Sequence, residues 1–392
     1  MSAALFDALK PQPADALLSL IALYRDDPRA QKLDLGVGVY RDETGATPVL
    51  RAVKAAEARL LETQTSKSYL GPEGDIRYTE LLQPIVFGRG LSSDEVAAVQ
   101  TPGGTGALRL AAELIAKAKP GAKVWLGTPT WPNHAPIMNS AGLTVATYRY
   151  YDQATQVVLF DEMMAALNGA DAGDIVLLHG CCHNPAGADL DAAQWKAVAE
   201  LVAARGLVPL IDLAYQGLGD GLEQDAAGAR QVLAAVPDAL LAYSCDKNFG
   251  LYRERVGALY VKAATAARTE LIRTNILSLA RANWSMPPDH GAALVRVILD
   301  DAGLTESWRT EVDEMRTRIN QVRQALATGD DRLAFLARQR GMFSLLPLSA
   351  EQVGVLRRDH AVYMAGSGRI NLAGLTVATV PQFIGALRAV WG

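Results

Sequence analysis

Short apolar runs alternate with amphipathic segments through the middle of the chain. The runs span residues 124–126, 144–148, 175–178, 208–211 and 240–243. They are too short for helices and lack polar alternation, which is typical of strands buried on both faces of a sheet. Between two of them, residues 191–205 carry an apolar helical face, with Asp191 and Gln194 as a predicted capping box and Gly206 as C-cap. The alternation predicts crossover units on a largely parallel sheet, and hence an α/β fold.

The two ends of the chain have a different pattern. Residues 304–328 place apolar side chains at heptad-like spacing, which predicts a long helix. A helix near residues 350–358 and a short strand ending at Asn371 follow it. At the other end, a helical pattern runs from about residue 14 to residue 24 and leaves roughly the first dozen residues as an extended arm. Such an arm is either frayed or bound to another surface.

The length of 392 residues exceeds what one hydrophobic core usually serves, so two domains are expected. Half of the residues are hydrophobic and 20% are charged, which is typical of a globular protein. We predict a large domain with a mostly parallel sheet flanked by helices, and a smaller α/β domain that includes the N-terminal arm. The large domain would span residues 45–300, and the small one residues 1–44 and 301–392.

Charge and cysteine content narrow the class of protein further. The net charge of −4 does not indicate binding to nucleic acid or to an anionic membrane, both of which favour a basic protein surface. Three cysteines do not make a disulfide framework and suit a reducing compartment. The N-terminus lacks a signal-peptide pattern, and the longest near-apolar run, residues 16–24, is too short to span a bilayer. We therefore expect a cytoplasmic protein with neither a nucleic-acid nor a membrane partner.

One lysine stands at the exit of a predicted buried strand. The strand around residues 239–243 is followed by Ser244 and Lys247, and Arg255 comes eight residues later. Removal from water favours the neutral, nucleophilic form of an amine. Ser244 and Arg255 are possible phosphate ligands, and carbonyl chemistry beside a phosphate suggests pyridoxal phosphate (PLP) held as a Schiff base. The alternative is that Lys247 only caps the strand at the surface.

A second informative stretch is rich in glycine. Gly103, Gly104 and Thr105 lead directly into a helix, where free backbone N–H groups and the helix dipole can bind an anion. No Gly-Lys-Ser/Thr follows, so this is not a nucleotide P-loop, and such helix starts are also common without ligands. Gly36 and Gly38 allow a ligand to approach the backbone or form a bulge, but they lack a dinucleotide fingerprint.

Polar residues after the predicted strands are the other candidates for chemistry, since ligands of parallel sheets bind beyond the carboxyl ends of the strands. Asp212 would be a buried carboxylate, paired either with a protonated pyridine nitrogen or with backbone donors. Tyr215 could reach a phenolate oxygen of the same ring. Trp131 is either a flat wall for a ring or ordinary core, and His134 is expected to support another residue by a hydrogen bond.

Metal binding and carboxylate binding are judged from spacing and residue type. His179, Cys181, Cys182 and His183 are too closely spaced for four-coordinate zinc, so no metal site is predicted. Arg281 and Arg369 have the bidentate geometry that suits substrate carboxylates, although either one alone could be a solvated surface residue.

Taken together and in this order, these residues resemble the aspartate/aromatic aminotransferases, the class I aminotransferases among fold-type I PLP enzymes. Residues 212–221, Cys245 and residues 252–255 look closest to the bacterial aromatic-amino-acid enzymes. The resemblance implies the fold of a fold-type I PLP-dependent transferase. It is carried by residues 35–45, 103–106, 131–134, 179–185, 212–217, 247–250 and 367–371.

The resemblance implies a role for each matching residue. Lys247 would bind the cofactor covalently and then transfer the proton, while Asp212 would pair with the ring nitrogen and be supported by His134. The implied cofactor contacts are Asn184 and Tyr215 to the ring oxygen, Trp131 to the ring face, and Gly103, Gly104, Thr105, Ser244 and Arg255 to the phosphate. The implied substrate contacts are Gly38, Trp131, Asn184, Arg281 and Arg369. A homodimer with shared active sites is implied, in which Tyr69 and Arg281 reach the site of the partner subunit.

Two positions depart from the pattern of the aspartate enzymes. Asp246 stands directly before Lys247 where a serine is usual, which puts a carboxylate beside the lysine. Trp284, Ser285 and Met286 replace the more usual Tyr-Ser-Asn and change the wall next to Arg281.

The resulting functional hypothesis is a ping-pong transaminase that moves an amino group from tyrosine, phenylalanine or tryptophan, and also from aspartate, to 2-oxoglutarate. The alternative within the family is an aspartate aminotransferase with a strict dicarboxylate preference. Two other classes stay open on the residues alone. A dehydrogenase would bind a dinucleotide at the glycine-rich turns, and a non-catalytic PLP-binding protein would have its lysine disabled by Asp246.

Overall fold

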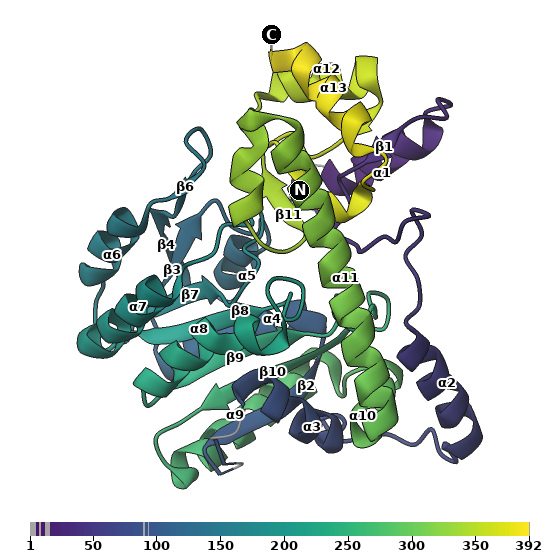
Figure 1. Cartoon of the computed structure of the whole chain (residues 1–392). Helices are drawn as coiled ribbons and strands as arrows, with labels where there is room; N and C mark the ends of the chain where they lie inside the picture. The colour runs from purple at the N-terminus through teal and green to yellow at the C-terminus, as the bar shows by residue number, and fades with distance from the viewer. Residues whose placement is uncertain (1–4, 8, 12–15, 89–90, 93, 392) are drawn as a thin grey trace.

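A seven-stranded sheet forms the centre of the molecule (Figure 1). The computed structural model describes residues 5–7, 9–11, 16–88, 91–92 and 94–391. Within the sheet, β10 runs antiparallel to both of its neighbours, and the other strands are parallel to one another. In spatial order the strands are β2 (Val96–Pro102), β10 (Val256–Lys262), β9 (Ala239–Ser244), β8 (Val208–Leu213), β7 (Ile175–His179), β3 (Lys123–Thr128) and β4 (Thr144–Arg149). The five predicted apolar runs are therefore all strands, and the predicted α/β class is confirmed.

Helices cover both faces of this sheet (Figure 1). Alternate residues of one strand enter different cores: Ile175 and Leu177 pack against one set of helices, Val176 and Leu178 against the other. The first set comprises α4 (Gly103–Ala118), α5 (His134–Ser140) and α9 (Ala266–Trp284). The second comprises α3 (Ile76–Phe87), α6 (Phe160–Asn168), α7 (Ala192–Arg205), α8 (Leu222–Ala235) and α10 (Asp289–Asp300), with α2 (Arg51–Thr63) behind them. Burial on both faces explains why the strands lack polar alternation.

The predicted helix over 191–205 is α7, and both of its predicted caps are present. The Asp191 side chain accepts from the Gln194 backbone N–H, the Gln194 side chain bonds back to the Asp191 backbone, and Gly206 is left-handed with φ of 63°. Capping of both ends fixes where the chain enters and leaves this helix, and so where the next strand, β8, begins.

A second, smaller core lies at one end of the molecule (Figure 1). Its apolar residues come from 33–35 and from the chain between 322 and 387. Its elements include the parallel pair β1–β12 and the antiparallel pair β11–β13. The elements are β1 (Leu33–Asp34), α11 (Ala302–Gly329), η1 (Asp331–Arg338), β11 (Phe343–Leu345), α12 (Ala350–His360), β12 (Val362–Tyr363), β13 (Arg369–Asn371), η2 (Leu372–Gly374) and α13 (Val380–Trp391). A small hairpin of β5 (Tyr151–Asp152) and β6 (Val157–Val158) lies beside the large sheet.

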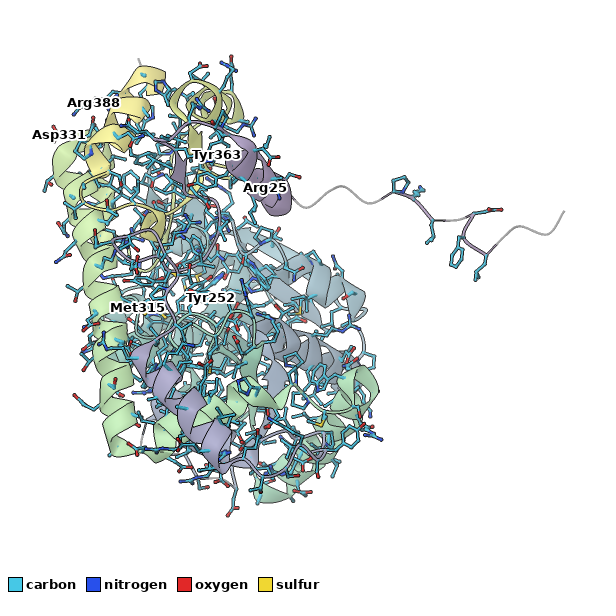
Figure 2. All side chains as sticks on the ribbon, turned by 90° about the vertical axis from the view of Figure 1, so that its right-hand side faces the viewer. Arg25, Tyr252, Met315, Asp331, Tyr363 and Arg388 are labelled. Carbon is cyan, nitrogen blue, oxygen red and sulfur yellow. The ribbon has the colours of Figure 1, made fainter. Side chains whose placement is uncertain are left out.

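Helix α11 connects the two cores and runs along the length of the molecule (Figure 2). Its first half contributes Trp308 and Met315 to the large core, and its second half contributes Val322 and Leu326 to the small one. The predicted boundaries at 44/45 and 300/301 stay a prediction.

The N-terminal helix is α1 (Ala16–Asp26), and the start of the predicted helix at residues 14 and 15 lies outside the described residues. The described residues before α1 lie away from the folded body (Figure 2). Among the described residues, no helix combines the length and the apolar character that a membrane crossing requires.

Candidate active site

Three neighbouring parallel strands end side by side and place polar residues at one edge of the sheet. His179 is the last residue of β7 and lies opposite Asp212 of β8, while Ser244 ends β9. A cavity with an empty volume of about 440 Å³, partly open to solvent, lies beyond these strand ends. Its lining residues are Gly104, Thr105, Leu108, Trp131, His179, Asn184, Asp212, Ala214, Tyr215, Ser244, Asp246 and Lys247. The sheet thus brings residues from five separate stretches of sequence to one cavity.

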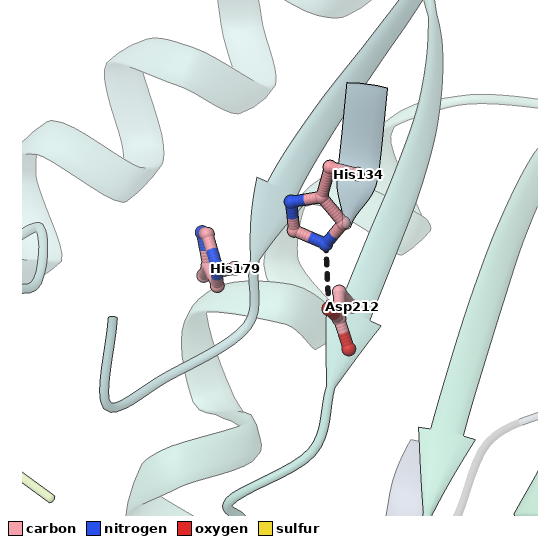
Figure 3. A group of neighbouring side chains, drawn as sticks. All are labelled: His134, His179 and Asp212. Atoms are coloured by element: carbon pink, nitrogen blue, oxygen red, sulfur yellow. Dashed lines mark hydrogen bonds and ion pairs between the residues drawn. The ribbon is translucent and has the colours of Figure 1, made fainter. Parts of the chain in front are cut away.

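Asp212 and His134 form a buried hydrogen-bonded pair at this cavity (Figure 3). His134 Nε2 lies 2.8 Å from Asp212 Oδ2, and His134 Nδ1 lies 2.8 Å from the Thr130 hydroxyl. An ionised carboxylate only accepts hydrogen bonds, so Nε2 donates to Asp212, and in a neutral imidazole Nδ1 is then the acceptor that faces the Thr130 hydroxyl. Burial is the largest single effect and opposes the charge of Asp212, but the hydrogen bond from His134 and the nearby charges together outweigh it, so the pKa of Asp212 is lowered. The pair therefore presents a negative charge to the cavity.

His179 is the third side chain of the same group (Figure 3). Burial, together with the nearby His134, lowers the pKa of His179 to about 3. Its Nε2 has no hydrogen-bond partner among the described residues. The three side chains His134, His179 and Asp212 are close enough to hold a metal ion. The bonds that His134 already makes to Asp212 and Thr130 use both of its ring nitrogens, so neither nitrogen is free to bind a metal. That the site holds no metal stays our prediction.

Asn184 and Tyr215 lie next to each other in the cavity lining, near Lys247. Asn184 Nδ2 donates to the Tyr215 hydroxyl at 3.3 Å, and Asn184 Oδ1 is buried with no partner in the described chain. The Lys247 amine lies 5.3 Å from the centre of the Tyr215 ring, and the lysine side chain is only 18% exposed. Burial raises the pKa of Tyr215, so its hydroxyl keeps its proton. An unsatisfied buried amide oxygen next to a phenol is typical of a site shaped for a polar ligand.

The start of α4 and the end of β9 form a cradle suited to an anion. Gly103 has φ of 69°, and a Cβ at this position would lie 2.6 Å from Arg255 Nη2. A Cβ at Gly104 would lie 3.0 Å from Ser244 Cβ. Glycine at both positions lets the helix start approach Ser244 and Arg255 this closely, and a Cβ there would require these side chains to shift. Arg255 itself has φ of 56°, a left-handed conformation that is uncommon for a non-glycine residue.

These observations fit a phosphorylated pyridine. The cradle offers backbone N–H groups, two hydroxyls and a guanidinium to a phosphate, as the N-terminus of a helix typically does. Asp212 offers a buried negative charge to a ring nitrogen, and Asn184 and Tyr215 offer hydrogen bonds to a ring oxygen. Trp131 lines the same cavity and supplies an aromatic face. The residues present therefore fit PLP.

Arg369 and Gly38 lie beside this cavity in the small core. Arg369 Nη2 donates to the Gly36 carbonyl at 2.9 Å, and its guanidinium carbon lies 4.9 Å from the centre of the Phe343 ring. A Cβ at Gly38 would lie 2.9 Å from the same ring. Arg369 shares the lining of a second, open cavity with Trp131, so the two cavities adjoin. Arg369 is therefore placed to meet an anionic group that enters past Trp131.

Two of the predicted residues, Tyr69 and Arg281, are exposed and do not line the cavity. Tyr69 is 91% exposed in a loop, and Arg281, near the end of α9, donates from Nη1 to the Ser285 hydroxyl at 2.7 Å in an exposed position. Both residues are predicted to act in the site of the partner subunit. Their positions within a single chain do not test these roles, which stay predictions.

Sequence reasoning missed two residues that position the site. Thr130 fixes the ring orientation of His134, and Phe343 packs under Arg369. The signal for Thr130 was a hydroxyl four residues before a histidine at a helix start. For Phe343 the sequence offered only a glycine turn, since its partners come from distant parts of the chain.

Fold and site together define a class of protein. A parallel α/β sheet that presents a lysine amine, a buried carboxylate and an anion cradle around one cavity is typical of an enzyme that transforms small anionic molecules through a covalent cofactor. The chain belongs to the aminotransferase class I and II family, whose pattern it matches over residues 30–387. The predicted family and the predicted type of enzyme are thereby confirmed.

Known relatives place the chain among two kinds of aminotransferase. It is 55% identical to the tyrosine aminotransferase of Rhizobium meliloti (strain 1021), over 97% of this chain and 99% of that one. It is 44% identical to the aspartate aminotransferase of Escherichia coli (strain K12), over 98% of this chain and 100% of that one. Among solved structures, the aromatic-amino-acid aminotransferase from Burkholderia pseudomallei, covalently bound to pyridoxal phosphate, superposes with a TM-score of 0.96 at 39% identity and full coverage of both chains.

Proposed function

We propose that this protein is a PLP-dependent transaminase that moves the amino group of an aromatic amino acid, and also of aspartate, to 2-oxoglutarate. The proposal is carried by one observation: a single cavity is lined by Lys247, by Asp212, which His134 supports from behind, and by Gly104, Thr105 and Ser244 of the cradle. When bound, PLP supplies an aldehyde that condenses with amines and a pyridine ring that accepts electrons. The family membership and the solved relative that carries pyridoxal phosphate support this cofactor.

The chain's own residues divide the work between them. Asp212 holds a positive charge on the ring nitrogen, and His134 keeps that carboxylate ionised and oriented. The Lys247 amine is the group that binds the cofactor and then moves a proton to and from the amino acid's α-carbon. The ring is oriented by Asn184 and Tyr215. The phosphate is held by Gly104, Thr105, Ser244 and Arg255. The α-carboxylate of the amino acid is bound by Arg369. A ping-pong reaction follows, because donor and acceptor use the same cavity in turn.

A homodimer with shared sites is part of the proposal. Tyr69 and Arg281 are exposed, and both are matched to roles in the partner's site. The described residues before α1 expose Leu5, Phe6 and Leu9, with exposures of 85%, 69% and 72%. Exposed apolar side chains of this kind favour burial against another chain. A cytoplasmic location is also proposed, since the three cysteines are buried and unpaired, as suits a reducing compartment.

The second candidate, an aspartate aminotransferase with strict dicarboxylate preference, is favoured by Arg281. Arg281 corresponds to the arginine of the family that binds the side-chain carboxylate of the substrate. The Escherichia coli aspartate enzyme is also a close relative. The two candidates differ in one respect: an aromatic donor must fit beside Arg281 or displace it.

A donor panel tests the proposal and separates these candidates. Each of tyrosine, phenylalanine, tryptophan and aspartate is mixed with the holoenzyme, and the change in cofactor absorbance is followed for that half-reaction alone. We expect all four to react; reaction with aspartate only would establish the strict alternative. In Arg281→Leu the aspartate half-reaction should fall by about 100-fold or more, while phenylalanine changes little. An equal loss for all donors would contradict a selective carboxylate role for Arg281.

The site itself is tested by chemical trapping. Borohydride reduction followed by peptide mass mapping should place the cofactor on Lys247. An adduct on another lysine, or none, would overturn the assignment of the cavity. Binding of a nicotinamide dinucleotide without a lysine adduct would favour the dehydrogenase class instead.

A further inference from the structure

Asp246 is a buried carboxylate between the two cations of the site. Its Oδ2 lies 2.9 Å from Arg255 Nη1 and 3.7 Å from Lys247 Nζ. The Asp246 side chain is 8% exposed, whereas that of Arg255 is 41% exposed. Asp246 Oδ1 is buried and has no hydrogen-bond partner among the residues that the structure describes. A buried carboxylate with an unpaired oxygen depends on its charge partners, here Arg255 above all.

Arg255 is also the permanent cation of the phosphate cradle. Its Nη2 faces Gly103, at the helix start where an anion would bind. Its Nη1 is already occupied by Asp246 and by the Tyr252 carbonyl at 3.0 Å. A phosphate that binds Arg255 therefore approaches a guanidinium that is already paired with the Asp246 carboxylate.

We propose that Asp246 is an internal anion that competes with the cofactor phosphate for Arg255 and so weakens phosphate binding. The inference rests on the proposed PLP site and goes beyond it, because it concerns how tightly that site holds its cofactor. On binding, Asp246 either keeps Arg255 and repels the phosphate, or releases Arg255 and loses its ion pair. Both outcomes lower the affinity, since like charges repel at short range and an unpaired buried carboxylate is unfavourable.

The test measures cofactor affinity rather than turnover. Pyridoxamine 5′-phosphate has no aldehyde, so its dissociation constant reports the non-covalent contacts with the cofactor-free protein. In Asp246→Asn, which keeps the size of the side chain, we expect it to bind about tenfold more tightly than in the wild type. Pyridoxamine, which lacks the phosphate, should bind both proteins equally. Asp246→Ser is a second variant and should also tighten binding of the phosphorylated ligand.

A matched control is available at the other end of the same strand. Asp238, just before β9, pairs with Arg268 at 3.0 Å. Asp238→Asn also removes a carboxylate from an arginine, but away from the cradle, and should leave both affinities unchanged. Circular dichroism and thermal unfolding of each cofactor-free variant show that the fold is kept.

The outcomes separate this inference from the proposed function. Equal or weaker binding of pyridoxamine 5′-phosphate in both Asp246 variants would overturn the inference, because Asp246 would then not oppose binding of the phosphate. An equal gain for pyridoxamine would also overturn it, because the gain would not involve the phosphate. If Arg255→Ala binds pyridoxamine 5′-phosphate as tightly as the wild type does, the phosphate is bound elsewhere and the proposed site itself fails.

Discussion

The charge of Asp212 is decided by two opposing effects. Burial favours the neutral acid, and the hydrogen bond from His134, with the nearby charges, favours the carboxylate. Because the pKa of Asp212 is lowered overall, the carboxylate stays ionised until the pH falls below the ordinary range for an aspartate. Across the pH range in which Asp212 is ionised, its carboxylate would hold a proton on a ring nitrogen that faces it.

This balance predicts how His134→Leu behaves. Without its donor, Asp212 keeps the cost of burial and loses the hydrogen bond, so the pKa of Asp212 rises. The activity that depends on the ionised carboxylate should then be lost at a higher pH as the solution is acidified. We expect the acid limb of kcat/KM against pH to move up by about one unit. His290→Leu, at an exposed histidine, is the control and should leave the profile in place.

An unshifted acid limb in His134→Leu would show that Asp212 does not need this hydrogen bond. A lower kcat at every pH, with no shift, would assign His134 a role in placing Asp212 without setting its charge.

Lys247 is the residue on which the proposed chemistry depends. In Lys247→Ala the amine that moves the proton is missing, so kcat should fall by about 10⁴-fold or more. The phosphate cradle is untouched, so pyridoxamine 5′-phosphate should still bind to the variant. Retained turnover would contradict the proposed role, and loss of both turnover and binding would point to a folding defect.

At the scale of elements, the start of α4 is the feature that the cradle depends on most. Gly103→Ala introduces two problems: a left-handed alanine, which costs roughly 1 kcal/mol, and a Cβ that would lie 2.6 Å from Arg255 Nη2. Gly121→Ala is a matched control, since Gly121 also has a positive φ, 84°, but its Cβ would have open space around it.

We expect both variants to lose similar stability in thermal unfolding, while only Gly103→Ala weakens binding of pyridoxamine 5′-phosphate, by about tenfold or more. If both variants bind the ligand like the wild type, Arg255 moves aside at no cost and the close fit of the cradle is unimportant.

The elements that could be predicted from sequence are those with one simple pattern. Strands β7, β8 and β9 are continuous apolar runs because helices cover both of their faces. Helix α7 shows its caps as well as its apolar face. Helix α10 was not predicted: its sequence, Asp-His-Gly-Ala-Ala-Leu-Val-Arg-Val-Ile-Leu-Asp, is apolar on most sides because it packs between α2, α3 and α11. Helix α9 was also missed, since only Thr269, Ile276 and Ala280 of its nineteen residues are buried.

The candidate site was predictable to the extent that local sequence encodes it. Strand ends mark Asp212, Ser244 and Lys247, and a glycine-rich helix start marks the cradle. Which groups meet could not be predicted, because contacts such as Thr130 to His134 or Asp246 to Arg255 depend on side-chain direction. The role of each residue came from the family resemblance, since on local sequence alone each one also had an ordinary structural explanation.

At the scale of the whole molecule, the proposed site is incomplete within one chain. The cavity holds Lys247, whereas Tyr69 and Arg281 lie on exposed surfaces outside it. In a two-fold symmetric dimer, an exposed residue of each subunit can complete the site of the other. If the sites are shared in this way, exchange of subunits between two defective variants can restore an intact site, which is impossible in a monomeric enzyme.

Two inactive variants should restore activity when their subunits are mixed. Lys247→Ala lacks the amine, and Arg281→Leu is expected to lose its reaction with dicarboxylates. After unfolding and refolding together in equal amounts, half of the dimers are hybrids, and one site of each hybrid has Lys247 from one subunit and Arg281 from the other. Turnover of aspartate with 2-oxoglutarate should therefore return to about a quarter of the wild-type rate. If both residues belonged to the site of a single subunit, each hybrid site would keep one defect and mixing would restore nothing. Refolding each variant alone is the control, because any activity it regains comes from the procedure and not from exchange of subunits.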